Sequence, residues 1–170
     1  SMHPGQYTVL NSPDEDVVSR AVEDLNYHTR FLDSLGVGPA HKIILHIGGV
    51  YQEKEIAMKR FVKSYQTLLS NAIKKRLVIE NDDRSYTVSE VLTISQATGA
   101  TVVYDNLHNA INTSDITKDD AYWIELTRKT WKPEDGRQKI HYSQQSPMNR
   151  IGAHTQTIAI EPFLDFYHQV

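Results

Sequence analysis

The chain has 170 residues, no cysteine and a formal net charge of −3 at pH 7. This length suits one domain with a sizeable core, and the lack of cysteine excludes disulfides and thiolate-bound metal clusters. The charge excludes a surface coated with basic residues but leaves room for a local basic patch. No apolar run approaches the roughly 18 residues of a membrane span and no signal peptide is recognisable, so we expect a cytoplasmic protein without membrane contact.

The first predicted helix has a clear start and stop. Ser12 is a capping residue three positions before Glu15, and Pro13 suits the first position of a helix. Apolar residues follow at helical spacing as far as Leu35, and Gly36 is expected to end the helix.

The rest of the chain alternates between short apolar strands and amphipathic helices. The helices are expected at about 52–70, from the capping box at 87–90 to Gly99, near 119–130 and near 157–167; the strands are expected at 43–45, 77–79, 101–104 and 139–142. This alternation predicts a parallel α/β sheet with right-handed crossovers.

Five strand-like segments end in a histidine or a carboxylate. These residues are His3, His46, Glu80, Asp105 and His141. The carboxyl ends of parallel strands meet on one face, so side chains far apart in sequence converge there, which favours a closed barrel over an open sheet. Imidazole and carboxylate ligands without thiols suit divalent manganese, zinc or magnesium.

The number of strands is too small for a complete barrel. A (β/α)₈ barrel has eight strands and about 250 residues, whereas this chain offers four strands and a stub at His3. We therefore expect residues 1–170 to form a single, incomplete TIM-barrel-type domain.

Several of these residues also fit structural roles. A single strand-end histidine is more often a hydrogen-bonding residue than a ligand, and Asp82, Asp83 and Asp105 suit loop or helix caps. Gly48 and Gly49 suit a tight turn. The remaining histidines, His28, His41 and His168, are expected to be structural.

The ordered set of motifs resembles the UV damage endonucleases, over nearly the whole chain. The motifs are His3-Pro4-Gly5-Gln6-Tyr7, Val9-Leu10-Asn11-Ser12-Pro13, Leu45-His46-Ile47-Gly48-Gly49, Glu80-Asn81-Asp82-Asp83, Tyr104-Asp105 with His108, and Lys139-Ile140-His141-Tyr142-Ser143. The resemblance implies a TIM barrel with a cluster of divalent metals, usually manganese. It also implies nicking of damaged double-stranded DNA on the 5′ side of ultraviolet photoproducts and other lesions.

The resemblance also implies roles for single residues. The expected metal ligands are His3, His46, Glu80, Asp105, His108, His141 and His154. Glu80 is the expected bridging carboxylate, and Lys139 matches a strand lysine that the family can carboxylate, so both are expected to be catalytic. Gln6 and Tyr7 match the pair that contacts DNA at the lesion.

The ends of the chain depart from the family pattern. Family members have two strands before the first motif and one after the last helix here, with a further glutamate ligand. We therefore expect weak metal binding, little nuclease activity and self-association through exposed sheet edges. Two alternatives remain: a metal-dependent sugar isomerase or epimerase on the same barrel, and a metal-binding fragment without catalytic activity.

Overall fold

The computed structural model describes residues 1–170 as seven α-helices and four strands, with a 3₁₀ turn at Pro133–Asp135. In chain order the elements are α1 (Glu15–Ser34), β1 (Ile43–His46), α2 (Lys54–Leu68), α3 (Asn71–Arg76), β2 (Leu77–Glu80), α4 (Val88–Thr98), β3 (Thr101–Asp105), α5 (Asn106–Ile111), α6 (Asp120–Arg128), β4 (Ile140–His141) and α7 (Ile160–Gln169).

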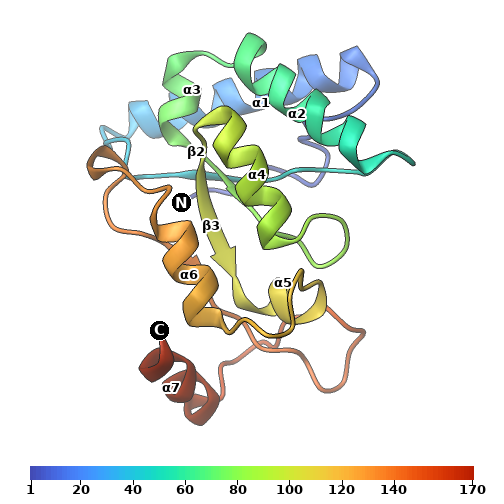
Figure 1. The fold of residues 1–170 in the computed structure, drawn as a ribbon. Helices are drawn as coiled ribbons and strands as arrows, with labels where there is room; N and C mark the ends of the chain where they lie inside the picture. Colours follow the sequence, from blue (N-terminus) through green and yellow to red (C-terminus); the bar gives the residue numbers. More distant parts are fainter.

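The four strands form one parallel sheet in the order β1-β2-β3-β4 (Figure 1). Met2 adds a parallel bridge beside Ile43, at the outer edge of β1. Because each strand lies beside the previous one, every crossover runs in the same direction, as in a (β/α) barrel; a doubly wound sheet reverses this direction. The predicted parallel α/β sheet is confirmed.

Alternate residues of each strand face two different apolar layers. The larger core of 18 buried residues packs one face of the sheet against the helices and includes Ile43, Leu45 and Ile79. Ile44, Val78 and Val103 form a separate cluster, with Trp131 packed against it. We call the face that carries this second cluster the inner face, since it corresponds to the inside of a barrel.

The amino ends of the strands are closed by a buried polar network. Lys42 is 1% exposed and donates to Asp135 at 2.5 Å and to the carbonyl of Lys75 at 2.8 Å. Thr101 donates to the other carboxylate oxygen of Asp135 at 3.1 Å. Asp135 therefore ties β3 to the residue just before β1, at the end of the sheet opposite the strand-end histidines.

One predicted helix start is wrong. Helix α1 begins at Glu15, and its N-cap is Asp14 rather than Ser12, because the Asp14 carboxylate accepts from the amides of Asp16 and Val17. Ser12 instead accepts from the amide of Asp14 and so braces the cap. The predicted stop at Gly36 is confirmed, since the chain turns there with φ of 69°.

Other helix ends agree with the sequence predictions, but two short helices, α3 and α5, were not predicted. The capping box of Thr87 and Glu90 opens α4, and left-handed Gly99 closes it. Helix α3 follows α2 after a break at Leu69, where Ser70 caps the new turn. Helix α5 starts directly from β3 because the Asp105 side chain accepts from the amide of His108.

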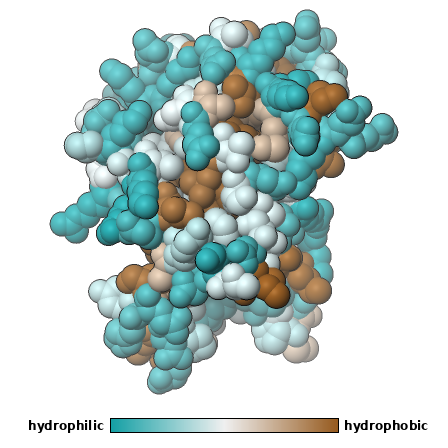
Figure 2. Space-filling view, viewed as in Figure 1, coloured by the Kyte–Doolittle hydropathy of each residue, from teal (hydrophilic) through white to brown (hydrophobic).

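Helix α7 lies apart from the other helices (Figure 1). Its one buried residue is Phe166, whose ring centroid is 4.7 Å from that of Tyr142. The face of the molecule in Figure 2 is mainly hydrophilic, with apolar side chains in small separate patches. None of the helices combines the length and apolar character needed to cross a bilayer.

Candidate metal centre

The strand-end side chains converge because they all occupy inner-face positions. His46 lies two residues beyond inner-face Ile44, Glu80 two beyond Val78, and Asp105 two beyond Val103. Side chains two apart on a strand share a face, so each ligand continues an apolar column to the carboxyl edge. The pairing aligns His46 with Glu80 and Asp105 with His141.

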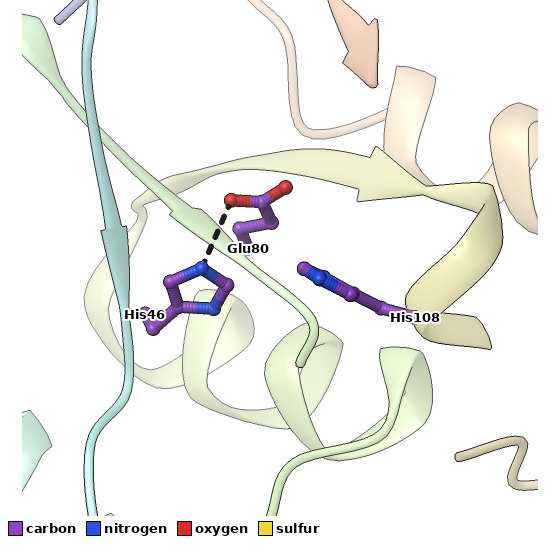
Figure 3. A group of neighbouring side chains, drawn as sticks. All are labelled: His46, Glu80 and His108. Atoms are coloured by element: carbon purple, nitrogen blue, oxygen red, sulfur yellow. Dashed lines mark ion pairs between the residues drawn. The ribbon is translucent and has the colours of Figure 1, made fainter. Parts of the chain in front are cut away.

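Two groups of three side chains meet at this edge and share Glu80. One group is His46, Glu80 and His108, drawn in Figure 3; the other is Glu80, Asp105 and His141. Within each group the potential ligand atoms lie within 4.8 Å of one another. Because Glu80 has two carboxylate oxygens, it can contribute one oxygen to each group.

The two oxygens of Glu80 do face different histidines. Oε1 accepts from Nδ1 of His141 at 2.6 Å, whereas Oε2 lies 3.4 Å from Nε2 of His46. The glutamate is 1% exposed, and its Oε2 is buried without a hydrogen bond. Nδ1 of His46 is likewise buried without a partner.

His108 is held with one ring nitrogen committed and the other free. Its Nδ1 donates to the carbonyl of Asn81 at 2.9 Å, which leaves the Nε2 lone pair as a potential ligand atom. The Asn81 side chain in turn bonds both the amide and the carbonyl of Asp105, at 2.9 and 3.0 Å. Asn81 therefore fixes the ends of β2 and β3 relative to each other.

These observations fit a divalent metal site. Buried polar atoms normally have hydrogen-bond partners, so an unpaired carboxylate oxygen beside three imidazoles suggests that a cation completes the site. Two overlapping groups around a bridging carboxylate suit a pair of ions. The ligand types match manganese, zinc or magnesium, as the sequence predicts, and do not distinguish among them.

His3 and His154 lie at the rim of the two groups. The His3 ring centroid is 5.1 Å from that of His141, and the His154 ring centroid is 6.0 Å from that of His108. Both residues are exposed. The structure therefore brings together all seven predicted metal ligands, five in the two groups and two beside them.

The charges of the cluster shift the pKa values of three members. Burial raises the pKa of Glu80, but the hydrogen bond from His141 and the neighbouring imidazoles outweigh burial and hold it below its ordinary value. Burial lowers the pKa of His141, whereas Glu80 raises it, with a net increase. Partial desolvation by the surrounding side chains lowers the pKa of His3; Glu80 opposes this shift and the neighbouring histidines reinforce it. The contact with Glu80 therefore favours the protonated form of His141, whereas the surroundings of His3 favour the neutral ring, which can bind metal.

Lys139 is placed differently from the ligands. It lies two residues before His141, on the same side of the chain, but its ammonium donates to the carbonyl of Ala40 at 3.0 Å. It also lies 5.7 Å from the ring centroid of Trp131. Ala40 precedes β1, so this ammonium points toward the amino ends of the strands, and its catalytic role stays a prediction.

The predicted DNA-contacting pair lies outside the ligand cluster. Tyr7 is 81% exposed, and Gln6 is also exposed. Both line an open cavity of about 970 Å³ that also includes Arg20 and Tyr51. The two side chains are therefore accessible to a large ligand beside the candidate metal centre.

The structural roles proposed for the other polar residues agree with the structure in part. Asp82 caps a turn by accepting from the amides of Arg84, Ser85 and Tyr86. His28 contacts the carbonyl of Asp24 within its own helix. Asn81 is the residue that sequence reasoning missed, although its place directly after Glu80 was a usable signal.

A profile of the family described as UV-endonuclease UvdE matches residues 1–169. The UV DNA damage endonuclease of Clostridium perfringens (strain 13 / Type A) is 46% identical over 175 residues, which cover 100% of this chain and 41% of that protein. The UV DNA damage endonuclease of Bacillus cereus (strain G9842) is 32% identical over 168 residues, or 99% of this chain and 52% of that protein. The chain thus spans about half the length of these relatives, or less.

Two solved structures are similar to this one. The crystal structure of SacUVDE superimposes with a TM-score of 0.91 at 41% identity, covering 99% of this chain and 56% of that chain. D-Psicose 3-epimerase from Clostridium cellulolyticum H10, solved with D-tagatose, superimposes with a TM-score of 0.59 at 18% identity, covering 88% and 55%. The epimerase likeness concerns the fold alone, which is of the TIM-barrel type. Both the sequence profile and the SacUVDE likeness extend over almost every residue, and the chain therefore belongs to the UV-endonuclease UvdE family.

Proposed function

We propose that this chain carries the metal centre of a DNA repair endonuclease that nicks the backbone 5′ to ultraviolet photoproducts and some other lesions. The observation that carries the proposal is the sharing of Glu80 by two potential ligand groups. Paired divalent ions, when bound there, would activate a water, bind the scissile phosphate and stabilise the leaving 3′ oxygen. The family relation supports DNA as the substrate, and the proposal takes this DNA to be a damaged duplex.

In this proposal the side chains divide the work by position. One ion would be held by His46 and His108, and the other by Asp105 and His141. Glu80 would contribute to both sites, since it belongs to both groups. His3 and His154 complete the ligand set from the rim. Manganese is the ion we expect, and zinc or magnesium would fit the same ligands.

The residues around the ligands orient them and contact the substrate. Asn81 keeps His108 in the tautomer that leaves Nε2 free and pins the backbone of Asp105. Gln6 and Tyr7 contact the DNA at the lesion, where an amide bonds base edges and an aromatic ring fills the space left by unstacked bases. Lys139 contributes a further negative ligand if it is carboxylated. The same proposal puts the protein in the cytoplasm, which holds the DNA in the bacteria of the two relatives.

The test uses an ultraviolet-irradiated, end-labelled duplex with manganese, and chelator as the control. The 170-residue chain is compared with a chimera that adds the flanking sequences of the Clostridium perfringens relative. We expect the chimera to cut 5′ to the lesion and the chain alone to cut weakly or not at all, and to self-associate through its sheet edges. No cutting by the chimera, under conditions in which the relative cuts, would contradict the proposal.

A sugar isomerase or epimerase would use the same kinds of ligand. The likeness to the epimerase shows the fold alone. A site for a small sugar would also not require the exposed side chains of Gln6 and Tyr7. A panel of ketoses and aldoses with manganese provides the comparison, and conversion of a sugar without DNA nicking would favour this alternative. A chain that binds metal but supports neither reaction in the chimera would be a binding fragment without catalysis.

A further inference from the structure

A hairpin between residues 144 and 155 connects the candidate metal centre to an exposed tip. It follows β4, appears orange-red in Figure 1 and extends past α5, away from the layer of helices. Its two arms pair in antiparallel fashion between Gln145 and His154. The arm that returns from the tip therefore ends at a predicted metal ligand.

Hydrogen bonds give the hairpin a defined shape. The amide of Ser146 donates to the carbonyl of Ala153 at 2.7 Å, and the amide of Thr155 donates to the carbonyl of Gln144 at 2.9 Å. The side chain of Gln145 accepts from Gly152 at 2.7 Å and donates across the loop to Arg150 at 3.0 Å. The tip is therefore held by its own backbone and by the side chains of Gln145 and Asn149.

The base of the hairpin is packed against the loop after β2. Gly152 has φ of 86°, and a Cβ atom there would lie 2.6 Å from Oδ2 of Asp83. Ser146 is buried beneath the tip. Because Asp83 follows Glu80 by three residues, the same loop that leaves the metal centre supports the hairpin, and the tip has a fixed position relative to the ligands.

The tip presents two large apolar side chains and a cation to solvent. Met148 is 89% exposed and Ile151 is 75% exposed, with exposed Arg150 between them in sequence. A single exposed apolar residue is ordinary, but two on a hydrogen-bonded hairpin beside a candidate site indicate a binding surface. A basic side chain next to apolar ones matches the surface with which proteins enter the minor groove of DNA.

We propose that this tip inserts into the minor groove of the duplex beside the scissile phosphate, with Met148 and Ile151 contacting the base step and Arg150 the backbone. The inference rests on the proposed function, since the substrate is DNA. It adds a second contact, on a different loop from Gln6 and Tyr7. One end of the hairpin, His154, lies beside the candidate metal centre, so the tip would contact the duplex near the scissile phosphate.

The hairpin is short, so its contact lies close to the cut. The side chain of Gln145 bonds both Arg150 and Gly152, which means that the tip folds back over its own base. The tip therefore contacts the minor groove next to the cut rather than far along the duplex.

The absence of cysteine makes this contact measurable. Met148→Cys introduces the only thiol of the chain. Duplexes carrying a disulfide-protected thiol in the minor groove, one to eight base pairs from the lesion, are incubated with this variant and manganese. Tyr27→Cys, at an exposed site on α1, provides the matched control. We expect cross-linking to Met148→Cys to peak at the positions nearest the cut and to run about 10-fold faster than the control, because binding raises the local thiol concentration.

The outcomes separate this inference from the proposed function. If the wild-type chain binds the duplex but Met148→Cys reacts no faster than Tyr27→Cys at any position, the tip does not contact DNA and the inference fails alone. If oxidised glutathione, which accepts the two electrons, couples Met148→Cys into disulfide dimers without DNA as fast as the variant cross-links to the duplex, a second copy covers the tip and the inference also fails. If the wild-type chain and the chimera both fail to bind duplex DNA, the proposed function fails with it.

Substitutions without cross-linking provide a second measurement. Met148→Ala with Ile151→Ala is expected to weaken duplex binding about 10-fold, through loss of apolar contact. Arg150→Ala is expected to lower the salt dependence of binding by about one charge. Ile116→Ala, at a 90% exposed apolar residue on another loop, is the control and should leave binding unchanged. Equal losses in the control and the tip variants, with manganese binding unchanged, would contradict a specific role for the hairpin.

Discussion

Glu80 and His141 form a 2.6 Å hydrogen bond between the ends of β2 and β4, past the intervening strand β3, and the carboxylate is almost fully buried. A metal ion held by Glu80, Asp105 and His141 would exchange for the proton of this hydrogen bond, because the ion and the proton need the same imidazole and carboxylate. The strength of this exchange is open to measurement.

The substitution Glu80→Gln tests the bridging role. The amide keeps the shape of the side chain but removes the charge and one acceptor oxygen, so we expect manganese affinity to fall about 100-fold or more. The chimera should lose cleavage, while circular dichroism stays unchanged. Titration calorimetry measures the affinity, with exposed Glu55→Gln as the control. Unchanged affinity and turnover in Glu80→Gln would remove this residue from the site.

Metal affinity should rise with pH. The contact with Glu80 raises the pKa of His141 above its ordinary value of 6.5, and the ring must lose its proton before it binds metal. The competition is therefore strongest below pH 6.5 and fades as the pH rises through the raised pKa. Calorimetry in buffers of different ionisation enthalpy should show proton release on binding near neutral pH. A flat affinity between pH 6 and 8 would show that His141 is not a ligand.

Asn81 should matter for the metal although it is not a ligand. Asn81→Ala removes both side-chain bonds to the backbone of Asp105 and leaves buried polar groups unpaired. We expect metal affinity to fall about 10-fold and the free energy of unfolding to fall by about 2 kcal/mol. Exposed Asn26→Ala, on α1, should change neither quantity. A loss of stability with intact metal affinity would limit Asn81 to the fold.

The ion pair of Lys42 and Asp135 should make the free energy of unfolding depend on pH in the acidic range. Burial raises the pKa of Asp135, but the bond from Lys42 outweighs burial and lowers it below 3.8. A lowered folded-state pKa stabilises the fold above pH ~4, and that stabilisation is lost as the pH falls through the folded value. Asp135→Asn should cost about 3 kcal/mol at pH 7, because it leaves the Lys42 charge buried without its partner.

The control for that substitution is the double variant Lys42→Met with Asp135→Asn. It removes both charges, so urea unfolding should show a smaller loss at pH 7 than the sum of the single variants. Its stability should also change less than that of the wild type between pH 5 and 3. Equal pH dependence in both proteins would mean that the pair does not control acid stability.

The turn after Gly49 stores backbone strain. Tyr51 and Gln52 both have positive φ, 48° and 71°, a conformation that costs non-glycine residues about 1 kcal/mol each. Gln52→Gly should therefore raise the free energy of unfolding by about 0.5 kcal/mol after the added chain entropy. Gly36→Ala is the opposite substitution and serves as the control. Gly36 has a φ of 69° and no atom near the position of a Cβ, so the alanine should lower the free energy of unfolding through backbone strain alone. Thermal unfolding measures both; a destabilised Gln52→Gly would mean that its side chain makes an important contact.

The sequence predicted the sheet well because strand ends carry unusual residues. Apolar runs that stop at His46, Glu80 and Asp105 mark both the strand and its functional end, and their spacing by two from Ile44, Val78 and Val103 decides which face they take. The parallel sheet, its strands and the gathering of the seven predicted ligands follow from these patterns and the motif resemblance.

The features that were not predicted depend on contacts that no local sequence pattern contains. The start of α1 depended on whether Ser12 or Asp14 captures the first free amides, a competition between two good caps. The direction of the Lys139 ammonium depends on the carbonyl of Ala40, 99 positions away. The bracing by Asn81 depends on the spacing between β2 and β3, which no local pattern contains.

The order of the strands has a consequence for how the protein is made. Each strand pairs with the one before it, so during synthesis every new strand meets a neighbour already outside the ribosome, and the pairings close short stretches of chain. His46, Glu80 and His108 come together first, His141 joins them with β4, and His154 arrives last with the hairpin. A nascent chain that has emerged only as far as α6 would therefore already hold one of the two potential ligand groups, before the other is complete.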